Sequence, residues 1–355
     1  MKTGGDHQQR KRAASQLGRP RVSWSIAHRI LGILAIVAPF LLTAVARVLP
    51  SVLKPRTVFM IYPGQWLELR AYCPGVLLPV VRTRLVWSRP VPVGAIMQGW
   101  RPVGMVTGVP NTQKELVRHR EDVAIIQSRL IAFSRKIGAR RVSMAGQLPG
   151  ILKRHGLKRD PMIVAGVFGT VFLVSSCIRR IFTQHDLSDR AQVTIFGVGM
   201  IGSSLIGHLS SEGFNVVGID QSPRTNDTHG LSEAITILGA TDVAVLLSSR
   251  GVDFLPYVEF LKKGAVVLDD THPSFPINRM ADVTVPPGVQ FYKAVATKPD
   301  LRFIPSLPGF ESEWIPGCAL EAIVLAECGI RKLESQSDFD NAASTMGFVG
   351  APMNM

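Results

Sequence analysis

The sequence is short of acidic residues in its first half and of cysteine throughout. Residues 1–190 contain 30 Lys and Arg but only 8 Asp and Glu, whereas residues 191–355 contain 10 and 18. The two halves therefore carry net charges of +22 and −8, which sum to +14. Four cysteines in 355 residues, with no Cys-x-x-Cys pair, argue against a disulfide framework and against a zinc site. We expect a reducing compartment and no metal.

The basic first half predicts an acidic partner. Anionic lipid, nucleic acid and an acidic carrier protein all satisfy the charge alone. No RNA-binding or DNA-binding motif accompanies the Lys and Arg residues, so nucleic acid is not expected as the partner.

A long uncharged run lies close to the N-terminus. Residues 30–46, ILGILAIVAPFLLTAVA, stand between Arg29 and Arg47, and Pro39 interrupts them. Seventeen residues are at the lower limit of a membrane span. A signal peptide, a buried helix and a membrane-associated hairpin or anchor all remain open. Basic residues on both sides favour the last, and this predicts a cytoplasmic protein that contacts membrane lipid through residues 30–46.

The next part of the chain predicts mixed α and β structure. Apolar residues recur every three or four positions between Thr112 and Gly138, which predicts an amphipathic helix, and ARRVSMAG after it reads as a strand. A second uncharged run at residues 161–178 contains Gly166 and Gly169. These small residues favour a helix packed tightly inside the protein over a membrane span.

The clearest motif begins at Gln192. The stretch QVTIFGVGMIGSSLIGHLSSEGFNVVGID predicts a strand, a Gly-x-Gly-x-x-Gly turn, a helix and a second strand that ends in Asp220. In this order the motif is typical of a dinucleotide-binding βαβ unit. Gly197 permits the tight turn, Gly199 lets the backbone approach a diphosphate, and Gly202 lets the helix pack closely on the strand.

Residues around this unit indicate the cofactor, NADPH or NADH. Asp220 favours NADH, since a carboxylate accepts hydrogen bonds from the ribose and repels a 2′-phosphate, and Arg224 nearby softens this preference. We expect further cofactor contacts from the turn and from the end of a later strand, namely from Met200, Ile201, Ser248 and Ser249.

Three residues are candidates for chemistry. Asp270 and His272 follow a predicted strand, where they would form an acid/base pair beside the nicotinamide. Cys318 stands at the start of an apolar helix, whose free N–H groups favour a reactive thiolate. Glu321, one turn further on, opposes that charge, and cysteine is also a common core residue. Whether Cys318 reacts or only packs is open from these residues alone.

A family resemblance favours the reactive interpretation. GCALEAIVLAECG at residues 317–329, followed by DFDNAASTMGFVGAPM, looks like the C-terminal segment of the long-chain acyl-(acyl carrier protein) reductases, which form fatty aldehydes. The resemblance is remote and covers roughly residues 65–352. Its other segments are AYCPGVLLP (71–79), MAGQLPGIL (144–152), GVFGTVFLVSSCIRRI (166–181) and VVLDDTHP (266–273).

This resemblance implies that Cys318 takes the acyl group from acyl carrier protein or acyl-CoA as a thioester, which NADPH then reduces to an aldehyde. Two other functions remain open: a dehydrogenase of a small carbonyl or hydroxy compound, and a non-catalytic nucleotide-binding protein at the membrane. Val171 and Phe172 stand where the family has polar residues, and Asp220 is unexpected in a family that uses NADPH.

The expected fold is α/β, with a Rossmann-type doubly wound parallel sheet, an N-terminal α/β substrate domain and an N-terminal hydrophobic segment. The expected divisions are a basic arm with the hydrophobic segment, a substrate domain, a Rossmann domain and a C-terminal helical segment that carries Cys318. Their ranges are 1–56, 57–185, 186–310 and 311–355.

Overall fold

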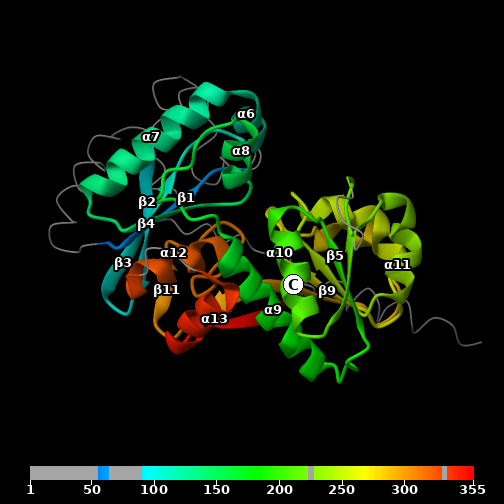
Figure 1. Ribbon diagram of the computed structural model, residues 1–355. Coiled ribbons are helices and arrows are strands. Elements are labelled where there is room, and N and C mark those ends of the chain that lie inside the picture. The colour runs from blue at the N-terminus through cyan, green and yellow to red at the C-terminus, as the bar shows by residue number, and fades with distance from the viewer. Residues whose placement is uncertain (1–54, 64–89, 223–227, 330–333) are drawn as a thin grey trace, which may run out of the picture.

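A computed structural model describes residues 55–63, 90–222, 228–329 and 334–355. The described chain forms two sheets with helices packed around them (Figure 1). The predicted anchor at residues 30–46 and Cys73 lie outside the described residues, as does Arg224. Within the described ranges, the structure contains no helix with both the length and the apolar character needed to cross a bilayer.

The first sheet has five strands in the order β11-β2-β3-β1-β4. β1 pairs in parallel with β3 and β4, whereas β2 is antiparallel to both β3 and β11. The strands are β1 (Thr57–Ile61), β2 (Val91–Gln98), β3 (Arg101–Gly108), β4 (Arg141–Met144) and β11 (Leu301–Ile304).

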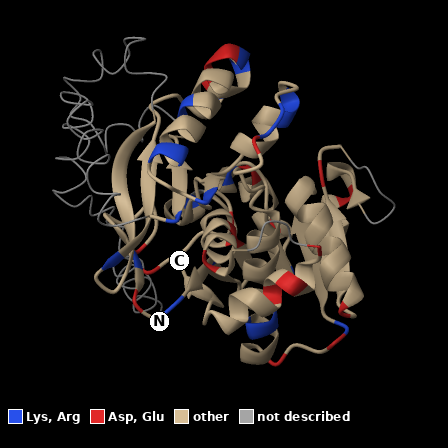
Figure 2. Ribbon diagram, turned by 60° about the vertical axis from the view of Figure 1, so that its left-hand side comes forward, with Lys and Arg blue, Asp and Glu red and all other residues tan. Residues whose placement is uncertain are grey.

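Three helices accompany this sheet, and the first two correct the expectation of a single helix. The helix predicted between Thr112 and Gly138 is divided into α6 (Gln113–Arg118) and α7 (Arg120–Lys136). Thr112 begins α6 with a capping box, and His119 adopts an extended backbone that ends it. α8 (Leu148–Arg154) follows β4. Figure 2 shows Lys and Arg at both ends of the long helix α7.

The second sheet has seven strands in the order β12-β10-β9-β8-β5-β6-β7. Its six parallel strands follow the 3-2-1-4-5-6 order of a Rossmann fold, and β12 adds an antiparallel edge strand. This confirms the predicted fold class. The strands are β5 (Gln192–Phe196), β6 (Asn215–Ile219), β7 (Thr228–His229), β8 (Val243–Leu246), β9 (Val266–Asp269), β10 (Gln290–Thr297) and β12 (Val349–Asn354).

The central strands are continuous apolar runs because helices cover both of their faces. Every residue of β8 and β9 is buried. The remaining helices are α9 (Val167–Gln184), α10 (Met200–Ser211), α11 (Ala234–Ala240), α12 (Gly317–Cys328) and α13 (Gln336–Thr345), with 3₁₀ segments at Leu231–Glu233, Gly251–Phe260 and Ile277–Asp282. Of these, α12 packs against β4 and β1 of the first sheet.

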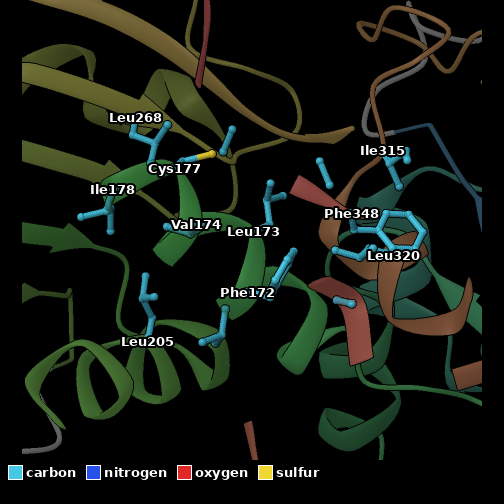
Figure 3. Packing of buried hydrophobic residues seen from close by; sticks show 14 of the residues in the cluster. Phe172, Leu173, Val174, Cys177, Ile178, Leu205, Leu268, Ile315, Leu320 and Phe348 are labelled. Atoms are coloured by element: carbon cyan, nitrogen blue, oxygen red, sulfur yellow. The ribbon is translucent and has the colours of Figure 1, made fainter. Parts of the chain in front are cut away.

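The uncharged run at residues 161–178 forms most of α9, as an interior helix. Figure 3 shows its side chains pointing in two directions. Cys177 and Ile178 lie near Leu268 on the side of the Rossmann sheet, and Phe172 and Leu173 lie toward Leu320. α9 therefore joins the two halves through one shared core, and the prediction of a buried helix is confirmed.

The end of the chain contributes to both sheets. β11 at Leu301–Ile304 joins the first sheet, and β12 at Val349–Asn354 joins the second. The chain therefore crosses between the two sheets more than once. The expected domain boundaries at residues 185/186 and 310/311 remain predictions.

Candidate functional site

The glycine-rich turn has the geometry that a dinucleotide requires. Gly197 has a φ of 102°, and a Cβ there would lie 2.6 Å from the backbone nitrogen of Ser248. A Cβ on Gly202 would lie 2.5 Å from the carbonyl oxygen of Gly197. Gly199, which begins α10, would meet no protein atom within 4 Å. The first and third glycines thus serve the fold, while the second faces open space beside the N-terminus of α10, where a diphosphate fits.

Asp220 ties the end of β6 to this turn. One carboxylate oxygen accepts a hydrogen bond from the N–H of Val198 at 2.7 Å, and the other accepts one from the N–H of Ser222 at 2.9 Å. A carboxylate has about four lone-pair positions, so Asp220 retains the capacity to accept ribose hydroxyls. Beside the turn, the Met200 side chain is 47% exposed and Ile201 is partly buried.

Ser248 and Ser249 lie just after β8, at the carboxyl edge of the sheet, as expected. Both hydroxyls bond within the following turn. Ser248 Oγ donates to the carbonyl oxygen of Arg250 at 3.0 Å, and Ser249 Oγ donates to Asp253 Oδ2 at 3.2 Å. Their contact with the cofactor remains a prediction.

A buried charge pair organises the loop that carries Asp270 and His272. Lys293 on β10 is 3% exposed, and its Nζ lies 3.3 Å from Asp269 Oδ2. Lys293 Nζ also donates to the carbonyl oxygen of Thr271 at 2.6 Å. Asp269 accepts three further hydrogen bonds, from the N–H and the hydroxyl of Thr271 and from the N–H of Phe275. The loop after β9 is therefore fixed by its backbone, and Asp269 has no lone pair to spare for a substrate.

Asp270 follows directly and is different in character. Its side chain is partly accessible, and its pKa is raised to about 7 because burial penalises the charge; Lys293 opposes this rise and Asp269 adds to it. His272 has an exposed surface. Desolvation of its imidazole by the surrounding protein and then the charge of Lys293 nevertheless lower its pKa, and Asp269 acts in the opposite direction. At neutral pH, Asp270 exchanges a proton readily and His272 is uncharged.

Cys318 lies close enough to Asp270 for the two side chains to interact electrostatically. Burial and then Asp270 raise the pKa of the thiol to about 12, although the N–H groups of Gly146, Ala319 and Cys318 itself act in the opposite direction. The thiolate expected from the helix N-terminus is therefore not the form present at neutral pH. Gly146 follows β4 and Asp270 follows β9, so the carboxyl ends of both sheets meet beside Cys318.

The helix that carries Cys318 has a close crossing with α9. A Cβ on Gly169 would lie 2.2 Å from the carbonyl oxygen of Gly317, and one on Gly317 would lie 2.5 Å from Thr170 Cα. Glu321 is 3% exposed and accepts a hydrogen bond from the N–H of Gly169 at 3.2 Å. Burial raises its pKa, and the N–H groups at the start of α9 oppose that rise. Glu321 therefore caps α9, whose own N-cap residue is a glycine.

Sequence reasoning identified the glycine turn, Asp220, Asp270, His272 and Cys318, and it placed Asp269 and Thr271 at the same strand end without giving them a role. It missed Lys293, although this residue carried a usable signal as a single charge within the apolar strand QFYKAVAT. It also missed the role of Glu321, which was expected only to oppose a charge on Cys318 and instead caps α9.

Comparison with known proteins gives fold-level likenesses. No protein-family model and no curated protein matches the chain. Among solved structures, the NADPH-dependent glyoxylate/hydroxypyruvate reductase of Sinorhizobium meliloti matches with a TM-score of 0.24 and 19% identity, over 30% of this chain and 53% of that one. The chain thus spans about half of that enzyme's length.

Two further structures are similar at the same level. A D-isomer specific 2-hydroxyacid dehydrogenase of Xanthobacter autotrophicus, in complex with NADPH, has a TM-score of 0.29 and 15% identity, over 59% of this chain and 82% of that one. The D-lactate dehydrogenase of Escherichia coli has a TM-score of 0.27 and 12% identity, over 66% and 83%. Other matching structures contain NADP or NAD⁺.

The comparison corrects the expected family. The three structures named above are dehydrogenases and reductases of small hydroxy acids and not acyl-(acyl carrier protein) reductases. The expected family, the acyl-thioester function and the acyl carrier protein or acyl-CoA partner are therefore wrong. The residues behind the resemblance have a structural explanation, because Gly166, Gly169, Gly317 and Glu321 form the crossing of α9 and α12. Close packing of two helices requires the three glycines, and the buried start of α9 requires the acceptor that Glu321 supplies, whatever reaction follows.

Proposed function

We propose that this protein is an NAD(P)H-dependent oxidoreductase that interconverts a carbonyl and a hydroxyl group of a small compound. The observation that carries the proposal is a carboxyl, Asp270, with a pKa of about 7 at the carboxyl edge of a sheet whose first turn is built for a dinucleotide. Reduction of a carbonyl needs a hydride at carbon and a proton at oxygen. The bound nicotinamide supplies the hydride.

Asp270 is the proposed proton donor in reduction and the proton acceptor in oxidation. A group with a pKa near the working pH is present in both forms and transfers its proton with little penalty. Lys293 and Asp269 fix the loop backbone that holds Asp270, so they are positioning residues rather than catalytic residues. His272, neutral at pH 7, is the proposed hydrogen-bonding partner of the substrate oxygen.

Cys318 has no covalent step in this proposal. A thiol with a pKa of about 12 is a poor nucleophile at neutral pH, because the thiolate is the reactive form. Hydride transfer to a free carbonyl needs no acyl-enzyme, and Cys318 then contributes packing beside the substrate position. The site therefore supports direct reduction of a carbonyl better than reduction of a thioester.

The first test measures nucleotide binding. NADH and NADPH are titrated by calorimetry into the wild type and into Gly199→Val. A Cβ at position 199 would meet no protein atom within 4 Å. The variant should fold normally and lose at least about tenfold in affinity, since the valine occupies the diphosphate position. Gly207→Ala, on an exposed turn of the same helix with no neighbour within 4 Å, is the matched control and should bind like the wild type.

The second test measures turnover. Oxidation of the reduced cofactor is followed with a panel of small aldehydes, ketones and 2-oxo acids, including glyoxylate and hydroxypyruvate. We expect turnover with at least one of them and its loss in Asp270→Asn, with cofactor affinity retained. A protein that binds neither nucleotide refutes the proposal. Binding without turnover would instead indicate a non-catalytic nucleotide-binding protein, and turnover that survives Asp270→Asn would refute the role of this carboxyl.

A further inference from the structure

The loop between β11 and α12, residues 305–316, connects the two sheets and lies against the loop after β9. We call it the crossing loop. Its backbone is fixed close to both ends. The N–H of Phe303 donates to the carbonyl oxygen of Ser312 at 2.7 Å, and Ile315 exchanges two hydrogen bonds with Ala296 of β10, at 2.8 and 2.9 Å. The side chains between these contacts are therefore held in a defined place.

Phe310 lies in the middle of the crossing loop, next to a residue proposed for chemistry. Its ring centroid is 6.4 Å from that of His272 and 5.7 Å from Nζ of Lys293. The ring of Trp314 stands nearly perpendicular to that of Phe310, with the centroids 6.5 Å apart. Both aromatic residues are partly accessible, whereas Lys293 is 3% exposed. Phe310 and Trp314 thus form an aromatic surface beside His272 that solvent reaches in part.

The ring of Phe310 also covers the ammonium group that holds the loop after β9. Lys293 Nζ donates to the carbonyl oxygen of Thr271 and pairs with Asp269, and Phe310 adds a cation–π contact. Protein groups therefore engage Lys293, and it is not free to pair with a carboxylate on a substrate. Asp270, with a pKa of about 7, is partly ionised at neutral pH and would repel such a carboxylate.

The start of α12 continues the apolar character of this segment. The crossing loop leads into the first turn of α12, which carries Cys318. Burial raises the pKa of this thiol to about 12, and a neutral thiol behaves as a small apolar group. Cys318 also interacts electrostatically with Asp270, so it belongs to the same neighbourhood. A substituent on a carbonyl carbon next to Asp270 and His272 would therefore meet apolar side chains from this part of the chain.

We infer that Phe310 determines substrate specificity, and that the substrate is an uncharged aldehyde or ketone with an aromatic or other apolar substituent rather than a 2-oxo acid. The inference rests on the proposed function, since it concerns the carbonyl compound on which Asp270 and His272 would act. The substituent lies against the ring of Phe310, where apolar area is removed from water and two rings pack face to face or edge to face. A 2-oxo acid would instead bring its carboxylate to an apolar ring and a partly ionised carboxyl.

The test compares kcat/KM for three aldehydes: benzaldehyde, which is apolar and aromatic, acetaldehyde, which is small and uncharged, and glyoxylate, which carries a carboxylate. We expect the wild type to prefer benzaldehyde to glyoxylate at least about tenfold. Phe310→Ala should lower kcat/KM for benzaldehyde at least about tenfold and for acetaldehyde less than about twofold, because only the aromatic substrate loses contact area and ring pairing. Phe310→Leu keeps most of the apolar area and should retain most of the activity. Phe310→Arg should favour glyoxylate, since a guanidinium group beside His272 pairs with its carboxylate.

Phe260→Ala is the matched control. Phe260 is also partly buried, but it lies on the 3₁₀ segment that leads to the amino end of β9, at the opposite edge of the sheet. This variant should keep the preference of the wild type, and every variant should bind the cofactor normally. A wild type that prefers glyoxylate, or an equal loss with benzaldehyde in Phe260→Ala, would overturn the inference and leave the proposed function intact.

A binding measurement separates the inference from the proposed function. Benzyl alcohol is titrated by calorimetry into the wild type and Phe310→Ala in the presence of the cofactor. If the wild type reduces none of the carbonyl compounds, the proposed function fails, and this titration still decides about the aromatic surface. Binding that is at least about tenfold weaker in Phe310→Ala supports the surface. Equal binding to both proteins, or binding to neither, overturns it.

Discussion

Replacement of Asp270 by asparagine should make the protein more stable at alkaline pH and inactive at the same time. The pKa of this carboxyl is raised from 3.8 to about 7, chiefly because burial disfavours its charge. Asparagine has almost the same shape and no charge to desolvate. The variant thus removes the desolvation penalty that a charged carboxylate after β9 imposes on the folded wild type.

The expected size follows from proton linkage. A carboxyl with a higher pKa in the folded state than in the unfolded state binds its proton more tightly when folded. The wild type therefore loses stability as the pH rises from about 4 to about 7. A rise from 3.8 to about 7 corresponds to roughly 4 kcal/mol at most, at about 1.4 kcal/mol for each pKa unit. Solvent reaches part of Asp270, so we expect about 1–2 kcal/mol at pH 8 and almost no difference at pH 4.

Urea denaturation of the wild type and Asp270→Asn across this pH range measures the difference. Glu259→Gln, at an exposed position of the same sheet's helical layer, is the control for removal of one carboxylate and should have nearly the same free energy of unfolding as the wild type. Cofactor titration in the same samples separates catalysis from binding. If Asp270→Asn is less stable than the wild type at pH 8, Asp270 makes a favourable ionic contact and the reasoning about desolvation is wrong.

Three further variants test the neighbouring structure. Gly317→Ala should lower the free energy of unfolding by about 1–3 kcal/mol, because a Cβ would lie 2.5 Å from Thr170 Cα; unchanged denaturation midpoints would show that the helices can separate freely. Lys293→Met should cost about 3–5 kcal/mol by leaving Asp269 buried without its cation, and a neutral result in thermal unfolding would contradict the positioning role. Cys318→Ser should keep cofactor affinity and turnover within about twofold. Loss of turnover with unchanged cofactor affinity would show that the thiol takes part in the reaction.

The sequence was most informative where structure is local. The glycine spacing, the apolar strand before it and Asp220 after it belong to one βαβ unit, and the structure brings Asp220 into contact with Val198. The interior position of α9 was also predictable, since Gly166 and Gly169 interrupt an otherwise apolar run. The break at His119 was not predictable, because the apolar periodicity continues through this residue. The capping box at Thr112 marks where α6 begins and gives no sign of where it ends.

The state of Cys318 shows where local reasoning fails. Its position at a helix N-terminus predicts a lowered pKa, and the N–H groups of Cys318 and Ala319 do act in that direction. Burial between two sheets and the charge of Asp270 outweigh them. Both opposing effects come from residues far away in the sequence, so they depend on how the two halves pack.

The adjacent residues Asp269 and Asp270 set the limit of what the sequence can assign. Neighbouring side chains on a strand point to opposite faces, so one carboxylate must turn inward and the other outward, but the pattern VVLDDTHP does not say which. The register of β9 and β10 decides it, because Asp269 lies directly opposite Lys293. The inward carboxylate is held by this lysine and three hydrogen-bond donors, and the outward one keeps the proton that the proposed reaction needs. Asp269→Asn, which removes the charge that pairs with Lys293, should therefore destabilise the loop, whereas Asp270→Asn should not.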